Sequence, residues 1–303
     1  MSFLHFLENI RIPVLNEFML GITYLGDEVA FLVVALILFW CIDKRKGYYI
    51  LSVGFIGTIA NQFLKLWFRI PRPWVLDSTL HPMDQALEAA KGFSFPSGHT
   101  QSAVGTFGGI AYTAKNKLVR IACLVLAVLV PFSRMYVGVH TPLDVGVAAA
   151  MAVVLIFAVR PFVLGKKKWG FPVLMVLMTA MAVSYLCFVE LYPFPADIDP
   201  ERLLSGVNSG YTMIGCLVGL LVVYIVDEKW LHFPVKGVWW VQILKVLIGL
   251  LLVLAIKSGM KTPLNALFGE YIGRAVRYFL MVVMAGIVWP LSFKVFAKIG
   301  VKE

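Results

Sequence analysis

The sequence has little charge, and acidic side chains are the scarcer kind. Only 15% of its 303 residues are charged, with 17 Asp and Glu against 27 Lys and Arg, whereas 60% are hydrophobic. A soluble domain carries about 25% charged residues, so this composition argues against a soluble protein. The basic excess would suggest a nucleic-acid partner in a soluble protein. We expect no such partner here, because the basic residues are divided among short loops between apolar runs.

Cysteines are also few. Cys41, Cys123, Cys187 and Cys216 fall in or near apolar runs and show no metal-ligand or redox spacing. We interpret them as small buried apolar residues. The first residues contain no positively charged segment followed by an apolar run, so we expect no cleaved signal peptide.

Apolar runs long enough to cross a bilayer recur along the chain. We predict an all-α, polytopic integral membrane protein with about nine transmembrane helices, since a span needs about 20 residues. An N-terminal interfacial helix is expected at Phe3–Phe18, where Pro13 interrupts the pattern. The predicted spans are Ile22–Ile42, Tyr48–Trp67, Ser97–Ala114, Ile121–Gly138, Leu143–Leu164, Phe171–Tyr192, Gly210–Val226, Val238–Ile256 and Tyr278–Phe296.

Basic residues are concentrated in alternate loops, as at Lys44–Lys46 and Lys166–Lys168. By the positive-inside rule these loops face the cytoplasm. The intervening loops, such as the acidic Pro193–Asn208, then face the opposite side. We expect a bacterial cytoplasmic membrane protein whose chemistry lies on the outer face. The basic residues between Lys257 and Arg277 argue against this orientation for the last two spans.

Three short segments place basic residues and histidines at the ends of apolar runs. They are Lys65–Pro73 (KLWFRIPRP), Phe95–His99 (FPSGH) and Ser133–Asp144 (SRMYVGVHTPLD). One Arg, Lys or Asp at the centre of a membrane helix costs about 2.5–3.5 kcal/mol. Repeated charge of this kind therefore requires a functional explanation.

The first two segments contain groups that suit a phosphate. Lys65 and Arg72 share a helical face if the second predicted span continues to the proline before Arg72. Ser97 is suited to cap the following helix, and Gly98 lets an anion approach the backbone N–H groups. His99 lies where it could protonate a leaving alkoxide. The alternatives are snorkelling basic residues in the first segment and a plain N-cap with a structural histidine in the second.

The third segment combines a helix start with a histidine. Thr141, Pro142 and Asp144 are typical of the N-cap, N1 and N3 positions of the fifth predicted span. Asp144 could then bond one imidazole nitrogen of His140 and leave the other as a nucleophile. Arg134 supplies a planar fork that suits phosphate oxygens. Asp144 could equally be a simple capping carboxylate, and both roles can hold at once.

Taken together, these segments resemble the signature of the type 2 phosphatidate phosphatase superfamily. That superfamily includes glucose-6-phosphatase, bacterial phosphatidylglycerophosphate and undecaprenyl-pyrophosphate phosphatases, and the vanadium haloperoxidases. Its signature is K-x6-RP, PSGH and SR-x5-H-x3-D. The matching positions are Lys65, Arg72 and Pro73, then Pro96, Ser97, Gly98 and His99, then Ser133, Arg134, His140 and Asp144.

The resemblance implies a role for each matched polar residue. His140 would be the nucleophile, Asp144 its partner, and His99 the general acid that later activates water. The expected phosphate-binding residues are Lys65, Arg72, Ser97, Gly98 and Arg134. The resemblance also implies catalysis without a metal or other cofactor. Three converging cations would disfavour a divalent ion, although His-x3-Asp by itself also has metal-ligand spacing.

The resemblance covers about residues 26–164. We therefore predict a phosphatase core at 1–164 and additional transmembrane helices of unread role at 165–303, within the same membrane domain. The expected activity is metal-independent hydrolysis of a lipid phosphate monoester or pyrophosphate through a phosphohistidine, because a site beside apolar spans favours a lipid substrate. The alternatives are a lipid phosphotransferase, a glucose-6-phosphatase-like enzyme for a soluble ester, and a noncatalytic phosphate-binding transporter or scaffold. The sequence leaves the oligomeric state open.

Overall fold

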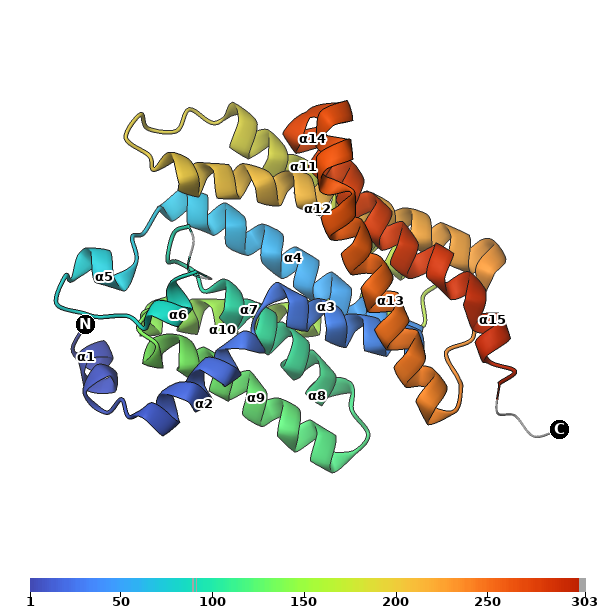
Figure 1. The fold of residues 1–303 in the computed structure, drawn as a ribbon, viewed down its shortest axis with the longest axis horizontal. Helices are drawn as coiled ribbons and strands as arrows, with labels where there is room; N and C mark the ends of the chain where they lie inside the picture. Colours follow the sequence, from blue (N-terminus) through green and yellow to red (C-terminus); the bar gives the residue numbers. More distant parts are fainter. Residues whose placement is uncertain (89, 91, 300–303) are drawn as a thin grey trace. The chain divides into compact units, whose positions relative to one another are not determined.

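A computed structural model describes residues 1–88, 90 and 92–299, and these residues form helices and loops without a strand (Figure 1). The predicted all-α fold is confirmed. The α-helices are α1 (Ser2–Asn9), α2 (Pro13–Tyr24), α3 (Glu28–Ile37), α4 (Lys44–Phe68), α5 (Pro73–Leu76), α6 (Asp84–Leu87), α7 (Gly98–Ala103), α8 (Gly109–Thr113), α9 (Lys117–Tyr136), α10 (Pro142–Val163), α11 (Gly170–Leu191), α12 (Pro200–Val226), α13 (Trp239–Gly259), α14 (Lys261–Val283) and α15 (Phe293–Phe296). Short π-helical turns occupy Leu38–Ile42, Val104–Gly108, Asp227–Leu231 and Met284–Val288, and a 3-10 turn occupies Trp289–Ser292.

Seven helical segments of the described chain are long and apolar enough to cross a membrane. An eighth is present if Pro13–Tyr24 and Glu28–Ile42, which are bent by 58° relative to each other, form one span. The predicted count of nine is not confirmed. The predicted span at Ser97–Ala114 has no long helix, because α7, its π turn and α8 extend only over residues 98–113. That length is shorter than the roughly 20 residues of a usual span.

The chain forms two compact units. Unit 1 comprises Met1–Leu32, Ile50–Pro161 and Pro193–Gly206, and unit 2 comprises Val33–Tyr49, Phe162–Tyr192 and the chain from Val207 onward. All three motif segments lie in unit 1. The predicted division of the chain at residue 164 is drawn along the sequence and stays a prediction.

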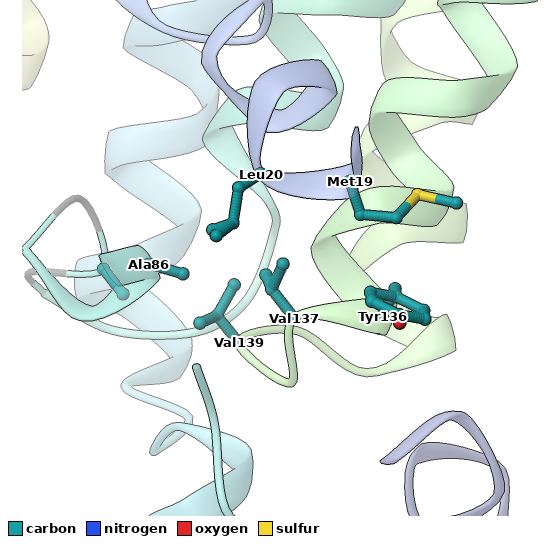
Figure 2. Close-up of a cluster of buried hydrophobic side chains, with 7 residues drawn as sticks. Met19, Leu20, Ala86, Tyr136, Val137 and Val139 are labelled. Carbon is teal, nitrogen blue, oxygen red and sulfur yellow. The ribbon is translucent and has the colours of Figure 1, made fainter. Parts of the chain in front are cut away.

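In unit 1, a buried apolar cluster holds the backbone that precedes His140 (Figure 2). Its members come from α2, from α6 and the loop after it, and from the end of α9: Met19, Leu20, Ala86, Ala90, Tyr136, Val137 and Val139. The Met83 N–H donates to the Val137 carbonyl at 3.0 Å. Gly138 has a φ of +82°, which favours glycine. These contacts determine where the chain presents His140.

In unit 2, two lysines that are buried or partly buried have partners of different kinds. Lys44 Nζ lies 2.8 Å from an Asp227 carboxylate oxygen and 3.7 Å from the centroid of the Phe233 ring. Lys245 is fully buried, with Nζ 4.6 Å from the centroid of the Phe293 ring. Both arrangements compensate a cation within the protein, the partly buried Lys44 by an ion pair and the buried Lys245 by a cation–π contact.

Candidate active site

The first motif leaves its helix earlier than the sequence suggests. Helix α4 ends at Phe68, and Arg69 follows with a left-handed φ of +51°. The prediction that Lys65 and Arg72 share a helical face is therefore wrong. The turn nevertheless brings Arg72 into the site, where its Nη1 lies 3.0 Å from His140 Nε2. Lys65 stays on α4, where its Nζ donates to the Phe93 carbonyl at 2.5 Å and its charge acts on His140.

The second motif begins a helix, as predicted. The Thr100 N–H donates to Ser97 Oγ at 3.4 Å, which confirms Ser97 as the N-cap of α7. Beside Gly98 there is open space, because a Cβ there would meet only Asn61 Oδ1, at 3.9 Å. The backbone is therefore accessible to an anion at this point.

Two further contacts orient the second motif. The Ser97 N–H donates to the Asp144 carbonyl at 3.1 Å and so joins this motif to the third. His99 Nε2 lies 2.7 Å from Asp27 Oδ1, at an angle outside hydrogen-bond geometry. The two side chains therefore lie within ion-pair distance, but no N–H of His99 points at the Asp27 oxygen.

The third motif forms the predicted capping box at the start of α10. The Thr141 N–H donates to Asp144 Oδ2 at 2.8 Å, and the Asp144 N–H donates to Thr141 Oγ1 at 3.2 Å. The same Oδ2 accepts from Ser94 Oγ at 2.7 Å and lies 3.5 Å from His140 Nδ1. One carboxylate oxygen thus caps the helix and faces the histidine.

The neighbours of His140 determine its tautomer. Arg72 can only donate hydrogen bonds, so the His140 Nε2 that faces it at 3.0 Å must present a lone pair. The ring proton then lies on Nδ1, on the side of Asp144. Burial, followed by the charges of Arg72 and Arg134, holds the pKa of His140 well below its ordinary value. The imidazole is therefore neutral, with Nε2 free of a proton.

Arg134 supplies a buried positive charge to the site, and Asp27 is the carboxylate that acts on it. Its side chain is fully buried, and none of its three guanidinium nitrogens has a hydrogen-bond partner among the described residues. Its charge acts on both His99 and His140. Leaving a buried ion unpaired costs several kcal/mol, so this position suits a bound anion.

Sequence reasoning missed three polar residues in this region. Ser94 bonds the Asp144 carboxylate, and Asp27 faces His99. Asn61 is buried beside Gly98, and its Nδ2 has no hydrogen-bond partner among the described residues. Asn61 precedes Lys65 by one helical turn, which is a signal that could have suggested it. Asp27 lies far away in the sequence and carries no local signal.

The described residues contain no group of three or more His, Cys, Asp or Glu side chains that could hold a metal ion. His140 instead lies between Arg72 and Asp144, and His99 faces the single carboxylate of Asp27. Metal independence stays a prediction.

The chain is similar to known families and proteins over the region that contains these residues. A family model described as "PAP2 superfamily" matches residues 45–168, and one described as "PAP2 superfamily phosphatase, transmembrane extension" matches residues 211–301. The chain is 35% identical over 167 residues to phosphatidylglycerophosphatase B of Bacillus subtilis, covering 50% of this chain and 77% of that protein. It is 30% identical over 159 residues to the undecaprenyl-diphosphatase BcrC of the same organism, covering 50% and 79%. It is also 30% identical over 228 residues to a probable sphingosine-1-phosphate phosphatase of Dictyostelium discoideum, covering 69% and 52%. No solved structure matches the chain significantly.

Proposed function

Because this chain belongs to the PAP2 superfamily, we propose that it is a membrane-embedded phosphatase that hydrolyses a lipid phosphate monoester or pyrophosphate. The names of its relatives, a phosphatidylglycerophosphatase and two undecaprenyl-diphosphatases among them, support this substrate class. The observation that carries the proposal is the 3.0 Å contact of His140 Nε2 with Arg72 Nη1, together with the buried Arg134, whose guanidinium has no hydrogen-bond partner among the described residues.

In the proposed first step, the phosphoryl group binds beside Arg134 and replaces His140 Nε2 as the partner of Arg72 Nη1. Nε2 of His140 attacks phosphorus, and the P–O bond to the leaving group breaks as His99 donates a proton to the leaving oxygen. Asp144 stabilises the positive ring through Nδ1. Lys65, Arg72, Ser97, Gly98 and Arg134 supply the charges and N–H groups for the phosphoryl oxygens.

In the proposed second step, water replaces the histidine. His99, now neutral, accepts a proton from water, and the water oxygen bonds phosphorus as the P–N bond breaks. Inorganic phosphate and the free His140 result. None of these roles requires a metal, so we propose a phosphohistidine mechanism that uses only side chains and backbone.

The His140→Ala variant tests the nucleophile. We expect phosphate release from phosphatidylglycerophosphate, phosphatidate and undecaprenyl pyrophosphate to fall to background in purified protein, because the covalent step is lost. His5→Ala, which changes a histidine paired with Asp77, is the control and should retain full turnover. Turnover that persists in His140→Ala would exclude the mechanism.

Two companion assays separate the alternatives. Adding a lipid alcohol acceptor should leave free phosphate as the main product, whereas a labelled phospholipid product would indicate a phosphotransferase. Glucose 6-phosphate should be a poor substrate, since a lipid can enter a site beside apolar helices from the bilayer. Preferred hydrolysis of glucose 6-phosphate would indicate a soluble-ester phosphatase.

We further propose that the protein lies in a bacterial cytoplasmic membrane with this site on the outer face, and that the phosphatase chemistry resides in residues 1–164. The basic loops at Lys44–Lys46 and Lys166–Lys168 support the orientation. In a cysteine-free background, a membrane-impermeant maleimide should label Thr79→Cys but not Lys167→Cys on intact cells. Both positions are exposed, so the reverse labelling would contradict the orientation.

A further inference from the structure

The turn between α2 and α3 reaches the proposed general acid. Asp27 Oδ1 lies 2.7 Å from His99 Nε2, and the two side chains are 33% and 15% exposed. Residue 27 precedes the part of the chain that the PAP2 superfamily model matches, which begins at residue 45. The contact therefore adds a carboxylate to the site from outside the three motifs.

Gly26 permits this close approach. A Cβ at Gly26 would lie 2.8 Å from Val130 Cγ1, 3.0 Å from His99 Cβ and 3.1 Å from the His99 carbonyl oxygen. A Cβ essentially never lies as close as 2.8 Å to another atom, and 3.0–3.1 Å is tighter than most Cβ contacts, so only glycine fits unless Val130 and His99 move. The turn thus packs directly on His99, and the position of the Asp27 carboxylate beside the ring follows from that packing.

The turn is also held from its other side. The Asp27 N–H donates to the Tyr24 carbonyl at 3.2 Å, and the Asp27 carbonyl accepts from the Phe31 N–H at 3.0 Å. Asp27 therefore stands between the end of α2 and the start of α3, with its backbone bonded to both helices. The backbone position from which its side chain reaches His99 is therefore fixed.

The charges around His99 give Asp27 a specific task. Arg134 on α9 and Arg72 after α4 act on the ring with positive charge, and His140 lies close enough to interact. A general acid must be protonated when the leaving group departs, and burial together with these positive neighbours opposes an imidazolium. Asp27 is the carboxylate that faces the ring and opposes them.

We infer that Asp27 is the positioning carboxylate of His99, which keeps its imidazolium available at the moment of P–O cleavage; the inference rests on the proposed function. With Nε2 held against Asp27, Nδ1 is the nitrogen that donates its proton to the leaving oxygen. In the second step the same nitrogen accepts a proton from water. Asp27 itself neither gains nor loses a proton.

The test uses two phosphate monoesters that differ in leaving group. Dodecyl phosphate has a poor leaving group and needs the acid, whereas p-nitrophenyl phosphate has a good one and does not. In Asp27→Asn, kcat/KM for dodecyl phosphate should fall by about 100-fold, a typical contribution of general acid catalysis. For p-nitrophenyl phosphate it should fall less than about 5-fold, because kcat/KM reports the step in which the P–O bond breaks. In Asp27→Asn, the alkaline limb of the plot of kcat/KM against pH for dodecyl phosphate should also move to lower pH.

Three variants keep the inference falsifiable. Asp77→Asn changes a carboxylate that faces His5 and should leave kcat/KM for both substrates unchanged. Asp27→Glu keeps the charge and should recover part of the dodecyl phosphate activity, even if Asp27→Asn folds poorly. Adding Asp27→Asn to His99→Asn should cause no further loss, since the residue it positions is already absent.

The possible outcomes are distinct. An equal loss with both substrates would overturn the inference, because it would indicate a structural role for the turn, and so would no loss with either. Failure of the proposed function would appear elsewhere, as p-nitrophenyl phosphate turnover that survives His140→Ala.

Discussion

The two units bury basic side chains in different ways. In unit 2, Lys44 pairs with Asp227, and Lys245 lies over the Phe293 ring. In unit 1, Arg134 is fully buried without a hydrogen-bond partner among the described residues; Arg72 acts on it with positive charge and Asp27 with negative charge. A buried charge that has a partner within the protein contributes to the fold, whereas a buried charge without a hydrogen-bond partner is available to bind a ligand. Within an apolar protein, the missing hydrogen-bond partner of a buried charge is therefore more informative than the charge itself.

Arg277 is the residue of unit 2 that most resembles Arg134. It is 5% exposed, and its Nε and Nη1 lack hydrogen-bond partners in the described part of the chain. The Tyr278 ring lies 5.7 Å from its guanidinium carbon. It is consequently the natural control for the contrast between the units.

The largest effect is expected at Asp144. Asp144→Asn should reduce kcat about 10³- to 10⁴-fold, by analogy with the same change in a hydrolase triad, because the histidine loses its orienting charge. The fold should persist, since asparagine also accepts hydrogen bonds at a helix start. Phosphate release and thermal unfolding of the detergent-solubilised protein would measure the two effects.

Thr141→Val provides the matched control, since it removes the other half of the same capping box. It should cost about 1 kcal/mol of stability and leave turnover within a few-fold. Equal losses of turnover in both variants would mean that Asp144 only caps α10.

The next effect is expected at Arg134. Arg134→Ala should lower kcat/KM about 100-fold, equivalent to about 3 kcal/mol, as when one oxyanion donor is removed. Arg277→Ala should change it less than about 5-fold. Steady-state kinetics on the same lipid substrate compares the variants directly, and equal losses would show that unit 2 also binds the reacting anion.

The smallest effect on turnover is expected at Lys245. Lys245→Met replaces a buried ammonium by an apolar chain of similar length, so stability should stay unchanged or rise by about 1–4 kcal/mol. Turnover should stay at the wild-type value. Thermal unfolding and phosphate release would be measured on one preparation, and a clear loss of turnover would contradict the separation of roles between the units.

Local features of the site could be predicted from the sequence. Ser97 and the Thr141–Asp144 pair begin helices as predicted, because capping depends on residues three or four positions apart. The convergence of the motif residues also follows from the family resemblance. These predictions needed no knowledge of distant contacts.

Other features depended on contacts that no short pattern encodes. Helix α4 ends early because Arg69 has a left-handed backbone conformation. Arginine seldom adopts this conformation, and no sequence pattern indicates it here. Asp27 comes to His99 only through the packing of Gly26 on His99 and Val130. The predicted count of nine spans exceeds the seven or eight found in the described residues. One reason is that α7, its π turn and α8 form only a short helical segment within an apolar run.

The shared oxygen of Asp144 has a consequence for how the protein can change. Oδ2 both completes the capping box of α10 and faces His140. The stability of the helix start and the reactivity of His140 therefore depend on the same atom. A substitution that improves the helix start alters the nucleophile, and one that retunes the nucleophile disturbs the helix start. Engineering for heat resistance should therefore begin in unit 2, where buried charges can be replaced without entering this exchange between stability and activity.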